Sequence, residues 1–142
     1  MDLNSPEEED FPGRLLHQAA LWDNAELLED LLKGDQRRHL DGQDSWGRTP
    51  LHAAATSENS RCLRVLLQCG ANPNIPCGPR GDNRTPLHLC AEYGFINNIM
   101  LLLAHKADLL AEDGCGLTPL SIAEKGEHVE CVTILKQAVG ES

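Results

Sequence analysis

Histidines and cysteines are the residues of this 142-residue chain whose types could support catalysis or metal binding. Three of the six histidines, His17, His52 and His88, stand at the same position of a repeated sequence. An imidazole titrates near neutral pH and is a common metal ligand. However, side chains one repeat apart in a stack of helical pairs are separated by about 10 Å, which is too far for one shared metal ion. We therefore expect these histidines to be structural.

The six cysteines show neither the spacing of a zinc site nor a sign of a disulfide framework. The chain has no Cys-x-x-Cys pair, whereas zinc sites draw on closely spaced ligand pairs. Most of the cysteines fall on apolar positions of expected helices, where cysteine acts as a small hydrophobic residue. We predict reduced thiols and no bound metal. The six residues are Cys62, Cys69, Cys77, Cys90, Cys115 and Cys131.

No arrangement typical of an enzyme accompanies these residues. The sequence has no phosphate-binding Gly-x-x-x-x-Gly-Lys loop, no His-Glu-x-x-His motif, and no recognisable pairing of serine or cysteine with histidine. It therefore predicts a protein that is not an enzyme and carries no cofactor.

The net charge of −10 is concentrated at the N-terminus. Residues 1–13 hold five acids and no base, so 22 − 5 leaves 17 acids against 12 bases, a charge of −5, for the rest of the chain. Without a basic stripe, this balance argues against a nucleic-acid partner. The composition of residues 1–13 predicts a disordered acidic tail. Within it, Ser5 is a candidate phosphate acceptor, and Phe11 is a candidate cover for the end of the fold.

The sequence also predicts where the protein is located. It has no run of about 18 apolar residues, as a membrane helix would require, and its N-terminus is acidic, whereas a secretory signal begins with basic residues. We expect no membrane insertion and an intracellular protein, cytoplasmic, nuclear or both.

A repeated segment positions all of these residues. Arg48 to Ala55 reads Arg-Thr-Pro-Leu-His-Ala-Ala-Ala, and Arg84 to Ala91 reads Arg-Thr-Pro-Leu-His-Leu-Cys-Ala. A third copy, Leu117 to Glu124, begins Leu-Thr-Pro-Leu-Ser. Threonine suits the N-cap of a helix and proline suits its first turn. Each copy therefore predicts a helix start, and the apolar spacing after it predicts a turn and a second helix.

The repeat divides the chain into four helix-turn-helix units after the tail. The first unit is degenerate and lacks Thr-Pro, as expected for a terminal repeat that faces water on one side. Gly70 is predicted to end a helix in the left-handed conformation, and residues 72–84 to form a longer projecting loop. The predicted units cover residues 14–43, 44–80, 81–112 and 113–140. The helices of the last three are predicted at Pro50–Ser57, Ser60–Cys69, Pro86–Tyr93, Ile96–His105 and His128–Ala138, besides the helix that begins at Pro119.

These segments resemble ankyrin repeats, and the resemblance extends from Arg14 to about Val139. It rests on Thr-Pro-Leu-His twice, on Thr-Pro-Leu-Ser once, and on the run from Leu66 to Asn74, which reads Leu-Leu-Gln-Cys-Gly-Ala-Asn-Pro-Asn. The resemblance implies an all-α solenoid of four helix-turn-helix units joined by β-turn or hairpin loops. It also implies that each repeated histidine bonds to the backbone of the adjoining loop.

Several residues depart from the family pattern at positions that favour glycine. Glu58 and Glu127 stand in the turns between paired helices, and Lys106 stands where the preceding unit has Gly70. Asn83 replaces a loop glycine but tolerates positive φ. A side chain in the left-handed conformation costs roughly 1 kcal/mol, so we expect Glu58, Glu127 and Lys106 to reduce local stability.

Ankyrin stacks bind partners with their loop tips and inner helices, and the resemblance places the corresponding positions in this chain. Both tryptophans and the only tyrosine fall among them, and tryptophan, tyrosine and arginine dominate the energetics of interfaces. Two alternatives stay open: Trp22 packs against the tail, and Tyr93 covers the turn between its helices. The predicted partner-binding residues are Leu21, Trp22, Ser45, Trp46, Arg48, Thr56, Ser57, Asp82, Arg84, Glu92, Tyr93, Cys115, Leu117 and Lys125.

Arginines gather in or beside the loops, so a locally basic loop face is expected on an acidic protein. Arginine binds carboxylate and phosphate groups in bidentate fashion, which makes an acidic or phosphorylated protein or peptide the expected partner. The leading hypothesis is a monomeric, non-catalytic adaptor or scaffold. Two alternatives are an inhibitor of a partner enzyme, as the similarly short cyclin-dependent kinase inhibitors are, and a regulatory domain of a larger transcriptional, channel or ubiquitin-ligase protein.

Overall fold

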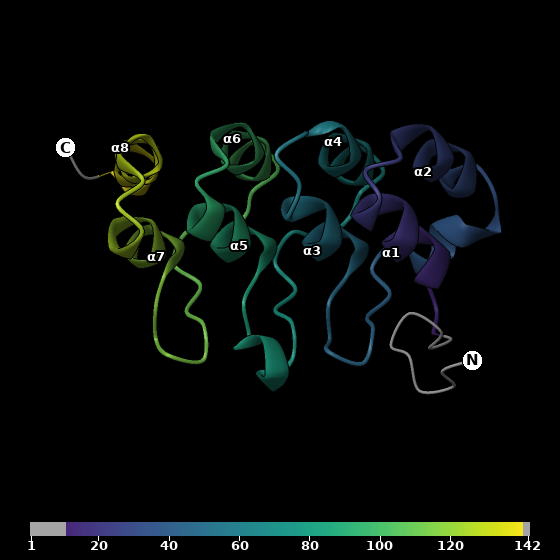
Figure 1. The fold of residues 1–142 in the computed structure, drawn as a ribbon, viewed down its shortest axis with the longest axis horizontal. Helices are drawn as coiled ribbons and strands as arrows, with labels where there is room; N and C mark the ends of the chain where they lie inside the picture. The colour runs from purple at the N-terminus through teal and green to yellow at the C-terminus, as the bar shows by residue number, and fades with distance from the viewer. Residues whose placement is uncertain (1–10, 141–142) are drawn as a thin grey trace.

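The computed structural model describes residues 11–140 and shows a stack of helical pairs (Figure 1). Residues 1–10 of the predicted tail lie outside this range, and its last three residues, 11–13, lie within it. Within the described residues, all regular structure is helical, as the sequence predicts. The helices are α1 (Arg14–Leu21), α2 (Ala25–Leu32), η2 (Asp35–His39), α3 (Pro50–Ala55), α4 (Arg61–Gln68), η3 (Pro79–Gly81), α5 (Pro86–Tyr93), α6 (Ile96–Ala104), α7 (Pro119–Lys125) and α8 (Val129–Val139), where η denotes a 3-10 helix.

The α-helices form two layers along the stack. Figure 1 shows α1, α3, α5 and α7 in the inner layer and α2, α4, α6 and α8 in the outer layer, with the connecting loops projecting from the inner side. Each inner helix packs against the inner helix of the next unit and against its own outer helix. The four units predicted from the sequence therefore stand side by side in chain order.

Small aliphatic side chains fill the space between units. Leu16, Leu51 and Leu87 occupy one position of three successive inner helices, and each is fully buried. Alanines such as Ala54 and Ala91 are also fully buried, which lets neighbouring helices approach closely. In the last unit Leu120 is only half-buried, because the described chain holds no further unit to cover it.

The helix ends follow the predicted chemistry with one correction. Thr49 accepts from the backbone N–H of His52 at 3.4 Å, and Gly70 has a φ of 96° after the end of α4. Asn83, Lys106 and Glu127 have φ values of 55°, 68° and 59°, as their glycine-like positions predict. The expectation for Glu58 was wrong: it is not among the positive-φ residues, because residues 56–60 form a longer turn between α3 and α4.

Hairpin-like loops project from the stack and touch one another. The loop of the second unit closes through hydrogen bonds from Asp44 N to Arg48 O at 2.9 Å and from Gly47 N to Asp44 O at 2.8 Å. Gly78 N in the next loop donates to Trp46 O at 2.7 Å. Gly47 has a φ of 79°, and a Cβ there would lie 2.4 Å from Gly78 N. This close approach fixes the position of Trp46 relative to the third unit.

Candidate functional site

A groove of about 580 Å³ runs along the inner-helix face across the first three units. Its floor comes from α1, α3 and α5, and its rim comes from the loops that precede α3 and α5. The lining residues are Phe11, Arg14, His17, Gln18, Leu21, Asp44, Trp46, Arg48, His52, Ala53, Thr56, Cys77, Gly81, Leu89 and Tyr93.

Trp46 stands on the rim close to two arginines. The guanidinium carbons of Arg48 and Arg80 lie 5.2 Å and 5.7 Å from the centre of its ring system, within the range of cation–π attraction. The tryptophan is still 39% exposed. Its backbone N–H donates to Asp44 Oδ1 at 2.9 Å, so the loop holds the ring in place while leaving it accessible.

The two arginines predicted to bind a partner, Arg48 and Arg84, have different surroundings. Arg48 Nε lies 3.0 Å from Asp44 Oδ2, and half of the Arg48 side chain is exposed. Arg84 forms two ion pairs, with Glu92 at 2.6 Å and with Asp113 at 3.4 Å, and its side chain is only 21% exposed. Arg48 therefore belongs to the rim of the groove, whereas Arg84 ties the third unit to the fourth.

These ion pairs reduce the positive charge expected on the loop face. Arg48 and Arg84 are each matched by carboxylates. Among the described residues, Arg37, Arg38 and Arg80 are loop-side arginines without an ion pair. Of these three, Arg80 lies beside the groove, against Trp46.

Tyr93 lies at the far end of the groove and is 49% exposed. Its ring stacks on Phe95 with the centroids 5.4 Å apart, and Phe95 is the N-cap of α6. The tyrosine therefore covers the turn between α5 and α6, as one alternative proposed, and still lines the groove. The alternative for Trp22 involves the tail and falls outside the described residues; Trp22 itself is 63% exposed and does not line the groove.

The structure brings only part of the predicted set together. Leu21, Trp46, Arg48, Thr56 and Tyr93 line the groove. The others, which do not line it, are Trp22, Ser45, Ser57, Asp82, Arg84, Glu92, Cys115, Leu117 and Lys125.

Three of the residues outside the groove make contacts within the fold. Ser57 O accepts from Asn98 Nδ2 at 2.7 Å, and Leu117 O pairs with His88 at 2.9 Å. Glu92 pairs with Arg84. These contacts give the three residues structural roles whether or not a partner touches them.

Sequence reasoning missed Phe11, Gln18, Leu89 and Arg80 as groove or rim residues. The signal for Arg80 was the extra length of residues 72–84, since a longer loop can reach the loop before it. Leu89 and Gln18 carried no separate signal, because their residue types are ordinary for a helix.

The three repeated histidines bond to backbone carbonyls, as the resemblance predicts. Nε2 of His17, His52 and His88 lies 2.9 Å from the carbonyl oxygens of Gly42, Arg84 and Leu117, respectively. In the second and third units, Nδ1 also accepts from the backbone N–H of the capping threonine, at 3.0 Å and 3.1 Å. This pattern requires a neutral ring with its proton on Nε2.

Burial keeps these rings neutral. Desolvation lowers the pKa of His52 to about 4, against the opposing effect of its bond to the Arg84 carbonyl. It also lowers the pKa of His17 and His88. The histidines of the first three units therefore fasten their inner helices to a loop through neutral rings.

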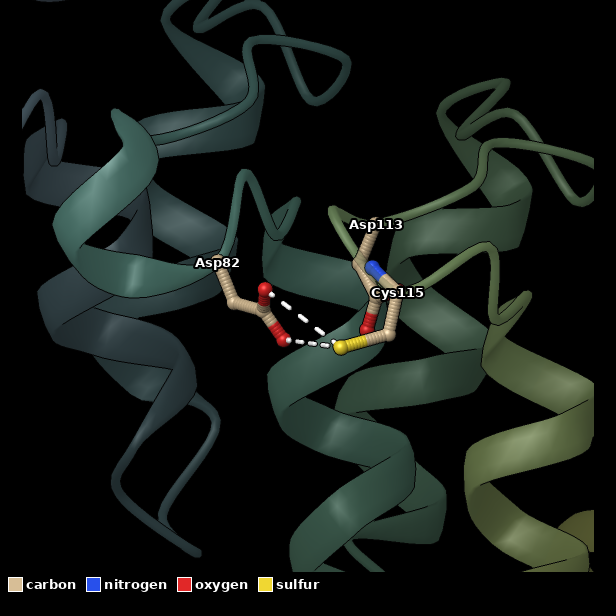
Figure 2. Close-up of side chains that lie close together, drawn as sticks. All are labelled: Asp82, Asp113 and Cys115. Carbon is tan, nitrogen blue, oxygen red and sulfur yellow. Dashed lines mark hydrogen bonds between the residues drawn. The ribbon is translucent and has the colours of Figure 1, made fainter.

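Asp82, Asp113 and Cys115 form a cluster of candidate metal ligands between two loops (Figure 2). The Cys115 thiol donates to Asp82 Oδ2 at 3.3 Å, and hydrogen bonding to that carboxylate raises the thiol pKa. Asp113 Oδ1 already accepts from the N–H groups of Cys115 and Leu117, both at 2.9 Å. Its other oxygen pairs with Arg84. The cluster thus fits a loop support better than a metal site.

Two further observations concern the cysteines and the lengths of the helices. All six cysteines are free thiols. No helix among residues 11–140 is long and apolar enough to cross a membrane.

Comparison with known proteins identifies the repeat. A family model described as "Ankyrin repeats (3 copies)" matches residues 16–113 and 70–141. Cyclin-dependent kinase inhibitor 2A of Monodelphis domestica is 31% identical over 142 residues, covering 98% of this chain and 78% of that protein. Inversin of Gallus gallus is 32% identical over 122 residues, covering 84% of this chain.

The relatives differ greatly in length. Transient receptor potential cation channel subfamily A member 1 of Homo sapiens is 33% identical over 130 residues, which is 89% of this chain. The chain spans only 10% of the chicken inversin and 11% of the human channel. Similar repeats thus occur in short proteins and as small parts of long ones.

Proposed function

This chain belongs to the ankyrin-repeat family, and from that premise we propose that it is a non-catalytic adaptor or scaffold that binds a protein or peptide in the inner-helix groove. Ankyrin repeats are generally protein-binding modules. The groove is the observation that carries the proposal, because it combines concavity with exposed aromatic and cationic side chains at positions that ankyrin repeats use for binding. Fold membership alone would leave the binding face open.

The rim and the far end of the groove provide the proposed anchors. Trp46 and Tyr93 are 39% and 49% exposed, so a partner can still remove a large apolar area from water at both. Tryptophan and tyrosine are enriched among the residues that dominate interface energy. Arg48 lies beside Trp46 with half of its side chain exposed, and can bind a carboxylate or phosphate group of the partner. The proposed partner is accordingly an acidic or phosphorylated segment.

We assign Arg84 a supporting role in this site. Its two ion pairs hold it between the third and fourth units, and a partner would have to break them to use its guanidinium. We further propose that the protein acts as an intracellular monomer, in keeping with its free thiols.

Affinity capture from a cell extract, followed by mass spectrometry, tests the proposed site. Trp46→Ala with Tyr93→Ala should reduce recovery of the specific partner at least about tenfold, as expected for interface anchors. Leu110→Ala is the matched control, since Leu110 is 66% exposed but lies outside the groove. Undiminished capture by the double variant, with the same fold by circular dichroism, would contradict the placement.

Inhibition of a protein kinase is a second candidate function. It is favoured by the alignment with cyclin-dependent kinase inhibitor 2A, which covers nearly all of this chain and 78% of that protein. The test is a panel of cyclin-dependent kinases assayed with and without excess protein. Inhibition of a kinase by the protein, but not by the Trp46→Ala and Tyr93→Ala double variant, would favour this candidate. If every kinase in the panel keeps its full activity, the adaptor function is the one supported.

A further inference from the structure

We propose that the groove has an intramolecular ligand: the acidic segment of residues 1–10 of the same chain, which a partner must displace. The inference goes beyond the proposed function, because it concerns the isolated protein. It rests on where the described chain begins, on the length and charge of the ten residues before that point, and on the chemistry of the rim.

The described chain begins inside the groove. Phe11 is one of the lining residues, and its ring meets His17 edge-on with the centroids 4.9 Å apart. The two following residues are fixed by close backbone packing. Gly13 is buried, with a φ of 90°, and a Cβ on Gly42 would lie 2.3 Å from Pro12 O. The preceding segment must therefore start from the end of the groove at α1.

The segment is long enough to follow the groove. The lining extends from Phe11 in the first unit to Tyr93 in the third, which is two repeat spacings or about 20 Å. Ten extended residues reach at most about 33 Å. The segment can therefore pass Trp46 without any rearrangement of the repeats.

The charge and apolar content of the segment match the rim and the floor. Residues 1–10 contain Asp2, Glu7, Glu8, Glu9 and Asp10, together with Met1 and Leu3, and no base. Arg80 has no carboxylate partner among residues 11–140, although it lies against Trp46. Arg48 also lies within 5.2 Å of that ring. Carboxylates from the segment would complete this rim, while Ala53 and Leu89 offer an apolar floor.

The covalent link favours this ligand over others of the same chemistry. A short tether gives an effective concentration on the order of 1 mM, so even weak contacts keep the groove occupied. A partner with a similar acidic segment must bind more tightly than the tethered one. The protein would thereby reject weak acidic competitors.

Fluorescence quenching of Trp46 by acrylamide tests the proposal in the full chain. Trp22→Phe leaves Trp46 as the only tryptophan in every sample, since the chain has two. In this background, Glu7→Gln, Glu8→Gln, Glu9→Gln and Asp10→Asn should raise the quenching constant about threefold, because charge-assisted contacts to the arginines are lost. Raising the salt to about 0.5 M should do the same without any change in the segment.

A matched variant tests whether the position of the removed charges matters, or only the change in net charge. Glu26→Gln, Glu29→Gln, Glu124→Gln and Glu130→Gln remove the same number of charges from exposed helix positions and should leave quenching unchanged. A synthetic peptide of residues 1–10, at about 1 mM, should restore protection to the segment variant.

Two results would overturn the proposal. The first is equal quenching of the background protein and the segment variant, together with no response to salt. The second is protection that depends on protein concentration, which would assign the groove to a second copy of the chain. The quenching experiment needs no partner protein. If Trp46 is protected but affinity capture recovers no partner, only the proposed adaptor function is refuted.

Discussion

The loops of the second and third units place an arginine at the same repeat position but use it differently. In the second unit, Asp44 caps its own loop and also pairs with Arg48 of that loop. In the longer loop before α5, Cys77 stands where the second unit has Asp44, because Cys77 N donates to Arg84 O at 2.8 Å as Asp44 N does to Arg48 O. Arg84 therefore has no carboxylate at that position in its own loop, and it pairs with Asp113 of the fourth unit.

The fourth unit explains why Asp113 is available. Its carboxylate caps the loop through Cys115 N and Leu117 N, as Asp44 does through Trp46 N and Arg48 N. However, the fourth unit has Leu117 where the second has Arg48, so one carboxylate oxygen is left for Arg84. One substitution in each of two neighbouring loops thus turns a local ion pair into a bridge between units, while Arg48 stays exposed on the groove.

Removal of the bridging carboxylate should have the largest effect on stability. Asp113→Ala leaves two backbone N–H groups and Arg84 Nε without their acceptor, and we expect a loss of about 3 kcal/mol in the free energy of unfolding. Asp44→Ala should cost about half as much, because Arg48 is half exposed and water can solvate it. Urea unfolding of both variants measures the difference. Equal losses would show that the bridge adds nothing to the loop cap.

Substitution of the two arginines should have the next largest effects on stability, and these effects should differ. Arg84→Gln should cost about 2 kcal/mol, because the Asp113 side chain is fully buried and loses its counterion. Arg48→Gln should cost less than about 0.5 kcal/mol, as is usual for an exposed ion pair. The same unfolding measurement applies. If Arg48→Gln proved the more destabilising, the assignment of Arg48 to binding and Arg84 to support would be reversed.

Acid should weaken the histidine contacts to these loop positions. His52 bonds to the Arg84 carbonyl and His88 to the Leu117 carbonyl, and protonation of Nδ1 would remove the acceptor for the capping threonine. The pKa of His52 is lowered from 6.5 to about 4, so the unfolded state binds the proton more tightly. This stabilisation is complete above pH 6.5 and is lost as the pH falls towards 4.

The pH effect has a defined size and window. His52 alone should reduce the free energy of unfolding by about 2 kcal/mol between pH 7 and pH 5. Burial alone would raise the pKa of Asp113, but hydrogen bonds from Leu117, Cys115 and Arg84 outweigh it and lower that pKa below 3.8. Its contribution is lost only at lower pH. Urea unfolding at pH 7 and pH 5, compared with His52→Gln, isolates the histidine term, and parallel losses would argue against it.

The sequence predicted the features that are encoded within a few residues. Thr49 and His52 are three positions apart and cap each other, so the motif itself specifies the helix start. The repeat also singled out Trp46 and Tyr93, and both line the groove, whereas their contact with a partner stays a prediction.

Features that depend on two units could not be read in this way. Arg84 meets a carboxylate 29 residues later in the chain, and the position of Arg80 against Trp46 depends on how two loops of different length lie together. The repeat pattern alone predicts the same role for equivalent positions such as Arg48 and Arg84. The role of an arginine here depends on whether an acid closes its own loop, as Asp44 does beside Arg48.

The smallest effect should come from a backbone difference between the same two units. Gly70 ends α4 with a φ of 96°, whereas Lys106 stands at the equivalent position after α6 with a φ of 68°. The left-handed conformation costs a side-chain-bearing residue about 1 kcal/mol, and glycine at position 106 would remove this cost. Part of the gain in stability is offset because glycine makes the unfolded chain more flexible. Lys106→Gly should therefore raise the free energy of unfolding by about 0.5 kcal/mol. Gly70→Ala should lower it, although a Cβ there meets no atom within 4 Å, because its cost is conformational. A loss of stability in Lys106→Gly would mean that the lysine side chain contributes more than its backbone strain costs.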